Sequence, residues 1–187
     1  MEELKQLLSQ LGANSSRDEI KSTFLKIAHI LLFKSYIKTK NGDFRMLEIE
    51  FYFRNCTHND EVTIIRTEKA GMWWLHDYGV DLSFKSEGRT FCGGVLIRSI
   101  VPLFKENGEN VICGPKNCCW VLFYSSAIEP SFAPQIVGTS ADFIGEMGMT
   151  TRYITGKTKG IDGDYRFFVK GLNLHFGTKY DASPWKE

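Results

Sequence analysis

The clearest alternation of apolar and polar residues lies in residues 44 to 58, FRMLEIEFYFRNCTH, and it predicts a β-strand. Successive side chains of a strand point to opposite faces. One face is formed by Leu47, Ile49, Phe51 and Phe53, and the other by Met46, Glu48, Glu50 and Tyr52. The first face must be buried. The second is either the solvated side of an edge strand or the floor of a cleft in which a glutamate acts as a general base.

Before this strand the hydrophobic pattern is helical. Residues 2 to 11 place leucines at positions 4, 7, 8 and 11, which predicts an amphipathic helix. Ser16 and Glu19 have the spacing of a capping box, so a second helix is expected to begin there. Near Leu32 the pattern changes to that of a strand, which we expect to continue to about Lys38. Asn41-Gly42 then predicts a hairpin that leads into the central strand.

After this strand, the pattern predicts a loop over residues 54 to 70 and a second hairpin of residues 72 to 76 and 80 to 84. A buried strand is expected at residues 91 to 100, with close backbone approach at Gly93-Gly94. Gly114-Pro115 indicates a helix start. Residues 125 to 150 are expected to be a loop or lid, and residues 165 to 170 the last strand. The expected class is α+β, with a curved, mostly antiparallel sheet flanked by helices in a single domain spanning residues 1 to 187.

Composition adds little to this picture. The chain has 187 residues, a net charge of +1 and five cysteines. No apolar run approaches the roughly 18 to 20 residues that cross a bilayer, and MEELKQLL has no basic segment typical of a secretory signal. We therefore expect a cytoplasmic monomer with reduced thiols and no membrane partner. The near-neutral charge predicts weak, salt-sensitive binding to any nucleic acid, with phosphate contacts on one face only.

Five segments, in order, resemble the alkyladenine (methylpurine) DNA glycosylase family. They are EIEFY (residues 48–52), GMWWLHDYG (71–79), GGVLIRSIVPL (93–103), VICGPKNCCWVL (111–122) and TRYI followed by DYRFFVKG (151–171). The resemblance covers residues 28 to 171, leaving N-terminal helices in residues 1 to 27 and an unplaced tail in residues 172 to 187. It implies a base-flipping enzyme that acts on double-stranded DNA containing a modified base.

The resemblance also implies roles for individual residues. Glu50 corresponds to the catalytic general base, and Arg98 with the backbone carbonyl of Val169 to groups that hold the attacking water. Tyr52 corresponds to a tyrosine that stacks on the flipped base. His58 corresponds to a pocket histidine, although its spacing from Glu50 is three residues shorter than in the family.

The second expected hairpin corresponds to the one that carries the DNA wedge in the family. Tyr78, at its expected tip, corresponds to the residue that enters the minor groove in place of the flipped nucleotide. Trp74 and His76 lie near the family's second stacking tyrosine, but the chain is one residue shorter here, so that either His76 or Leu75 occupies this place. Phe84 or Lys85 stands where the family has an asparagine that excludes guanine.

Cations and thiols complete the candidate set. Arg152, Arg166 and Lys170 are candidate phosphate contacts, although surface cations are often only solvated. Cys118 and Cys119 are adjacent on an expected helix and do not easily face one site with Cys113, and neither a CxxC motif nor paired histidines accompany them. We expect no metal and no cofactor.

The sequence therefore indicates a monofunctional DNA glycosylase that hydrolyses the N-glycosidic bond of a modified base and leaves an abasic site. Its substrate is either an alkylated or deaminated purine, in base-excision repair, or a hypermodified base of phage DNA such as glucosylated hydroxymethylcytosine, in antiviral defence. The alternatives are a non-catalytic nucleic-acid-binding module on the same scaffold and a small-molecule enzyme that reuses the cleft.

Overall fold

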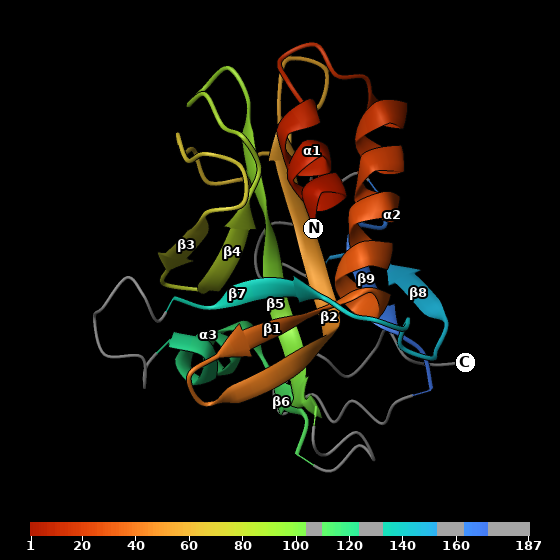
Figure 1. Ribbon diagram of the computed structural model, residues 1–187. Coiled ribbons are helices and arrows are strands. Elements are labelled where there is room, and N and C mark those ends of the chain that lie inside the picture. Colours follow the sequence, from red (N-terminus) through yellow and green to blue (C-terminus); the bar gives the residue numbers. More distant parts are fainter. Residues whose placement is uncertain (104–109, 124–132, 153–162, 172–187) are drawn as a thin grey trace.

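The computed structural model describes residues 1–103, 110–123, 133–152 and 163–171 (Figure 1). These residues form three helices and nine strands. In chain order they are α1 (Glu2–Gln10), α2 (Arg17–Phe33), β1 (Ser35–Thr39), β2 (Gly42–Arg54), β3 (Trp73–His76), β4 (Gly79–Ser83), β5 (Cys92–Pro102), β6 (Ile112–Cys113), α3 (Pro115–Phe123), β7 (Gln135–Gly138), β8 (Met147–Thr150) and β9 (Arg166–Val169).

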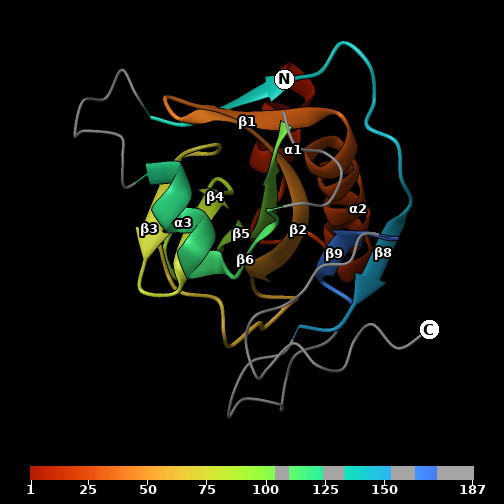
Figure 2. The same cartoon turned by 90° about the horizontal axis from the view of Figure 1, so that it is seen from below.

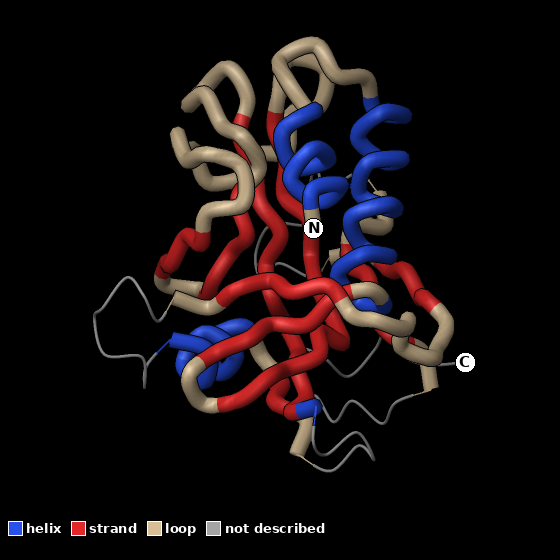
Figure 3. The backbone as a smooth tube through the Cα atoms, viewed as in Figure 1, coloured by secondary structure: helices blue, strands red, loops and turns tan. Residues whose placement is uncertain are grey.

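The strands form one curved sheet in which every pairing is antiparallel, and the predicted α+β class is confirmed (Figures 2 and 3). The main order is β3-β4-β5-β2-β1-β7. Strand β9 also pairs with β2, and β8 pairs with β9. The long strand β2 is therefore central, and the expectation of a solvated edge strand is wrong.

The first two helices cover one face of the sheet. The predicted leucine stripe of α1 is buried, and Ser16 and Glu19 form the predicted capping box at the start of α2. Phe24 of α2 stacks on Phe51 of β2, with ring centroids 4.3 Å apart. Helix α2 continues to Phe33, past the predicted change to a strand at Leu32. The run from Ile30 to Phe33 is buried throughout, so its apolar character suited either structure.

The opposite face of the sheet carries polar side chains on central strands. The strand register aligns Trp74, Asp81, Leu96, Glu50 and Arg166 in one row across five strands. Directly opposed residues share a face, so this row lies opposite the face that α2 covers. Between Met46 and Ile49 the pairing of β2 with β5 shifts register at a β-bulge, which locally increases twist and re-aims side chains.

The other predicted elements show one clear error. The two hairpins, the loop over residues 54 to 70, the strand at residues 91 to 100, the helix at Pro115 and the last strand are confirmed. Of the segment of residues 125 to 150, expected to be a loop or lid, residues 125 to 132 lie outside the described residues, and the remainder contains β7 and β8. These strands are only four residues long, and their pairing with β1 and β9 decides their conformation.

The glycine pair in β5 has the predicted close approach. A Cβ atom on Gly94 would lie 2.7 Å from Nη1 of Arg66, and a Cβ atom on Gly93 would collide with the backbone of Tyr52. In the part of the chain that is described, no helix is long and apolar enough to cross a membrane. The tail predicted from residue 172 lies outside the described residues.

Candidate functional site

Two glutamates of β2, Glu48 and Glu50, lie at the centre of a buried network of ion pairs and hydrogen bonds. Glu48 is 1% exposed and Glu50 is 0% exposed. The carboxylate of Glu48 accepts hydrogen bonds at Oε1 from Nε of Arg166 and, at 3.0 Å, from Nε of Arg98. Its Oε2 accepts one of 2.7 Å from the hydroxyl of Ser99. Both oxygens of Glu48 are thus occupied by donors from β5 and β9.

Glu50 has a different environment. Its Oε2 accepts a hydrogen bond of 2.7 Å from the hydroxyl of Tyr52 and lies 3.2 Å from Nη1 of Arg98. Its Oε1 receives no hydrogen bond from the described residues, and Nε of Arg166 is 3.9 Å away. The predicted pairing of Arg98 with Glu50 is present, and one carboxylate oxygen of Glu50 has no hydrogen-bond donor among the described residues.

The tyrosine of this network stays protonated. Burial is the largest effect that raises the pKa of Tyr52 well above its ordinary value, and the charge and hydrogen bond of Glu50 raise it further. A protonated phenol donates to Glu50 and does not compete with it as a base. Tyr52 therefore orients the carboxylate.

Arg152 closes the network on one side of Tyr52. Its guanidinium lies 4.7 Å from the centre of the Tyr52 ring and 5.3 Å from that of Tyr165. It also donates to both oxygens of the Asp60 carboxylate, at 2.8 and 3.1 Å. One face of Tyr52 is thus covered, so a base could stack only on the other.

The expected phosphate contacts need correction. Arg166 and Arg152 are buried, and each holds a buried carboxylate. A buried arginine paired in this way presents no N–H group to a DNA backbone, so a role as a surface phosphate contact does not fit either residue. Lys170 is exposed and lies 3.6 Å from Glu146.

A second buried cluster lies in the same row of the sheet, on β3 and β4. Asp81 forms an ion pair of 2.6 Å with Arg66 and accepts from Nε2 of His76 at 3.2 Å. The guanidinium of Arg66 lies 4.0 Å from the centre of the Trp74 ring, which stacks on His76. Gly94 provides the space for this pair. Trp74 and His76 thus share the sheet face of Glu50.

The register of the hairpin separates the two candidates for the stacking position. Leu75 pairs with Val80 and points to the opposite face from His76. Only His76 lies on the face of Glu50. Phe84 packs in the core against Phe24, and Lys85 is exposed beside Glu87, so neither lies with the polar cluster.

Tyr78 is at the tip of the hairpin, as predicted, and is 66% exposed. Its backbone N–H donates to Nδ1 of His76 at 3.3 Å. Since Nδ1 accepts this bond, the ring proton is on Nε2 and is donated to Asp81. Gly79, with φ of 148°, packs against Pro115 of α3 and anchors the tip. The exposed tyrosine therefore stands on a rigid base.

The remaining candidates, His58 and Val169, lie around the network of Glu48 and Glu50. His58 is buried, and its ring packs edge-on against Tyr165 with centroids 5.5 Å apart. Val169 pairs with Met147 of β8, one residue beyond Phe168, which pairs with Glu48. The structure thus places Glu50, Tyr52 and Arg98 in direct contact, and His58 and Val169 around them.

Several polar members of these clusters were not predicted from the sequence, namely Asp60, Arg66, Asp81 and Ser99. Asp81 had a usable signal, because VDLSF (residues 80–84) alternates apolar and polar residues as the central strand does. Asp60 and Arg66 are in the irregular loop, where no periodicity indicates burial.

The thiols of α3 are in an environment that keeps them neutral. Burial raises the pKa of Cys118 well above its ordinary value, and the charge of Glu48 adds to this effect. Burial also raises the pKa of Cys119. Among the described residues, no group of three or more histidine, cysteine or acidic side chains could hold a metal ion.

Comparison of the chain with known proteins finds no matching family model and no matching curated protein.

Proposed function

We propose that this protein is a DNA N-glycosylase of the alkyladenine type, which hydrolyses the bond between a modified base and its deoxyribose. The observation that supports this most strongly is the state of Glu50. A fully buried carboxylate is held at one oxygen by Tyr52 and Arg98 and has no hydrogen-bond donor at the other among the described residues. An acceptor in this state suits a general base better than a structural ion pair.

The proposed chemistry uses one water molecule. Glu50 Oε1 accepts a proton from the water as its oxygen attacks C1′ of the flipped nucleotide, and the N-glycosidic bond breaks with its electrons passing to the base. The leaving base takes up a proton from solvent. The carboxylate charge stabilises the positive charge that develops on the sugar, and Arg98 and Tyr52 fix the orientation of the carboxylate.

Access to Glu50 is the main requirement of this proposal. The side chain is fully buried, so the flipped base and the water reach it only when neighbouring groups move. Base-flipping enzymes enclose the target base in a tight pocket, and buried catalytic groups benefit from the exclusion of bulk water. Burial of Glu50 is therefore compatible with catalysis.

The substrate that we propose is a polar or bulky modified base. His76 and Trp74 occupy the region of the family's second stacking residue, and His76 is bonded to Asp81. A buried polar group that gives up its partner when a base enters, and gains none from that base, disfavours a plain purine by roughly 1 to 3 kcal/mol. A glucosylated pyrimidine of phage DNA would offer such partners, whereas a deaminated or alkylated purine is the candidate for a repair role.

The proposal is tested by incubating the protein with duplexes that carry alkylated, deaminated or glucosylated bases, followed by hot alkali. Alkali cleaves at abasic sites, so a strand break identifies the accepted base. Glu50→Gln should reduce excision by about 10² to 10⁴-fold, the usual cost of losing a general base, while DNA binding is retained.

Glu87→Gln is the matched control, because it makes the same change at an exposed carboxylate that, in the part of the chain that is described, pairs with Lys85 alone. The Glu87→Gln variant should excise the base at the same rate as the protein without a substitution. If the Glu50→Gln variant excised the base as fast as the protein without a substitution, Glu50 would have no role in the mechanism. Binding of modified DNA with no excision of any base would favour the non-catalytic module instead.

A further inference from the structure

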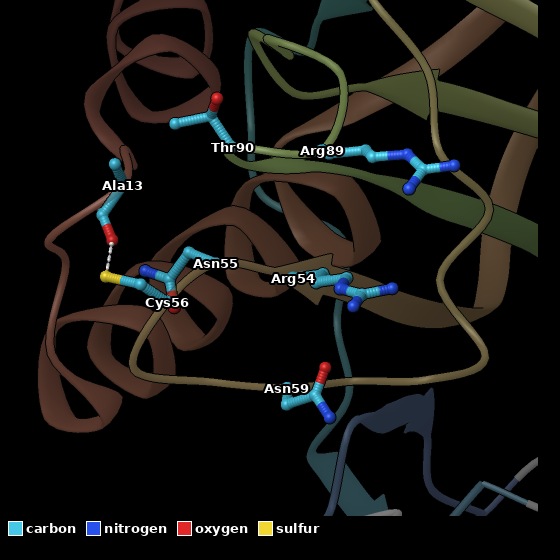
Figure 4. Close-up of a pocket in the computed structure, with 7 residues that line it drawn as sticks. All are labelled: Ala13, Arg54, Asn55, Cys56, Asn59, Arg89 and Thr90. Atoms are coloured by element: carbon cyan, nitrogen blue, oxygen red, sulfur yellow. Dashed lines mark hydrogen bonds between the residues drawn. The ribbon is translucent and has the colours of Figure 1, made fainter.

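We infer that a second site, separate from the Glu48 and Glu50 network, binds a phosphate group in a pocket at the end of β2. The pocket has a volume of about 370 Å³ (Figure 4). It is lined by Ala13, Arg54, Asn55, Cys56, Asn59, Arg89 and Thr90. Nothing in the proposed catalytic mechanism uses these residues.

Two arginines line the pocket, and neither has a carboxylate partner among the described residues. Within the described residues, neither Arg54 nor Arg89 forms a hydrogen bond or an ion pair with a carboxylate. This contrasts with Arg66, Arg98, Arg152 and Arg166, each of which holds a buried carboxylate. In Figure 4 the side chains of Arg54 and Arg89 extend in the same direction from neighbouring segments. Two guanidinium groups that line one pocket and lack a carboxylate partner among these residues favour a bound anion.

The other lining groups suit a phosphate. None of the described residues that line the pocket is acidic, and Asn59 and Thr90 add amide and hydroxyl donors. Glu61 accepts a bond of 3.4 Å from the amide of Asn59 but pairs with neither arginine. Arginine forks match the geometry of phosphate oxygens, and neutral donors complete the coordination of such a group.

The walls of the pocket are fixed by hydrogen bonds. The amide of Asn55 donates to the carbonyls of Gly12 and Ser15, each at 2.9 Å, and its oxygen accepts from the N–H of His58 at 2.8 Å. The thiol of Cys56 donates to the carbonyl of Ala13. These bonds tie the end of β2 to the connection between α1 and α2, so the pocket is present before a ligand arrives.

The segment that carries Arg89 is also held by backbone hydrogen bonds. Glu87 N–H donates to the carbonyl of Phe91 at 2.7 Å, and Thr90 N–H to that of Glu87 at 3.2 Å. Gly88, with φ of 62°, donates to the carbonyl of Arg66 at 2.9 Å. Arg89 therefore projects from a tight turn, and binding a ligand costs little backbone ordering.

The place of the pocket suggests two sources for the phosphate. Arg54 is four residues beyond Glu50 on β2, about 13 Å along a strand, and it alternates onto the face of Glu48, Glu50 and Tyr52. Along the axis of a double helix this distance corresponds to about four base-pair steps. A backbone phosphate or a free phosphate ester therefore fits this site, and the shared chemistry is the phosphate group.

The first test titrates the full chain with inorganic phosphate, and separately with an unmodified single-stranded oligonucleotide, while the side-chain Nε–H signals of the arginines are followed by NMR. Saturable shifts of the Arg54 and Arg89 signals are expected. This measurement uses the unmodified protein, so it does not depend on whether a variant folds, and it does not require the proposed glycosylase activity.

The second test measures affinity in Arg54→Gln, Arg89→Gln and, as a matched control, Arg17→Gln, which removes the same charge from the exposed start of α2. Loss of a charge-assisted bond at either pocket arginine should weaken phosphate binding by about three- to tenfold, and Arg17→Gln should not. If oligonucleotide affinity and its salt dependence fall in parallel, the ligand is a nucleic-acid backbone. If only phosphate binding falls, the ligand is a free phosphate ester.

The absence of saturable shifts with both probes would overturn the proposal. An equal loss of affinity in Arg17→Gln would do the same, because it would show a response to total charge alone. Failure of the glycosylase assay leaves these measurements unaffected, so the two proposals stand or fall separately.

Discussion

At the scale of single residues, Glu48 and Glu50 show how one strand gives two carboxylates different roles. Glu48 is surrounded by donors at both oxygens, from Arg98, Arg166 and Ser99. Among the described residues, Glu50 has hydrogen-bond donors at one oxygen only. We infer that Glu48 holds the two arginines in place, whereas Glu50 is the group available for chemistry.

Glu48→Gln should therefore destabilise the protein by about 3 to 5 kcal/mol, because it leaves the buried guanidinium of Arg166 and the partly buried one of Arg98 with less compensating charge. The free energy of unfolding from urea denaturation measures this effect. Glu87→Gln, which breaks an exposed pair with Lys85, should change stability by less than about 1 kcal/mol. Equal effects of the two substitutions would contradict a structural role for Glu48.

At the scale of elements, the hairpin of β3 and β4 combines an exposed tip with a buried base. Asp81, Arg66 and His76 join the two strands and the preceding loop on the sheet face of Glu50. The tip is attached to this cluster through the bond from Tyr78 N–H to His76. A rigid element with one projecting aromatic suits insertion into a stacked duplex better than adaptable surface contact.

If Tyr78 is a wedge, Tyr78→Ala should reduce excision from duplex DNA by about 10- to 100-fold and affect single strands much less, since unstacking costs a few kcal/mol only in the duplex. Single-turnover rates on the two substrates give the comparison. Leu75→Ala is the control, because Leu75 is 52% exposed on the same hairpin but points to the other face. Similar losses on both substrates would assign Tyr78 a structural role.

At the scale of the whole molecule, a net charge of +1 hides an uneven distribution of charge. Four arginines are used internally against buried carboxylates, and two line the pocket at the end of β2. The interior also contains ionisable groups that are kept neutral. Burial raises the pKa of Tyr52 and of three thiols, Cys92, Cys118 and Cys119.

These raised pKa values predict a loss of stability in alkali. Above about pH 9 the unfolded chain releases protons that the folded chain retains, so the free energy of unfolding falls as pH rises, by up to about 1.4 kcal/mol per pH unit for each group. Below that pH the contribution is fully present. Urea denaturation between pH 8 and 11 measures the slope.

Cys118→Ala should reduce this slope, whereas Leu122→Ala should lower stability at every pH without changing it. Both residues are fully buried on α3, and only the first is ionisable. A slope unchanged in Cys118→Ala would show that this thiol titrates alike in the folded and unfolded chains.

Elements with a regular period or a local signal could be predicted from the sequence. The leucine stripe of α1, the capping box at Ser16, the hairpin indicated by Asn41-Gly42 and the alternation of β2 each depend on interactions within a few residues. Pairing of Arg98 with Glu50 was also predicted, because an arginine in an apolar strand needs a carboxylate. The central place of β2, the burial of Arg152 and Arg166 and the position of Asp81 on the polar face could be learned from the folded chain alone. Each of these depends on which strands pair across long separations in the chain, and local periodicity does not specify such partners.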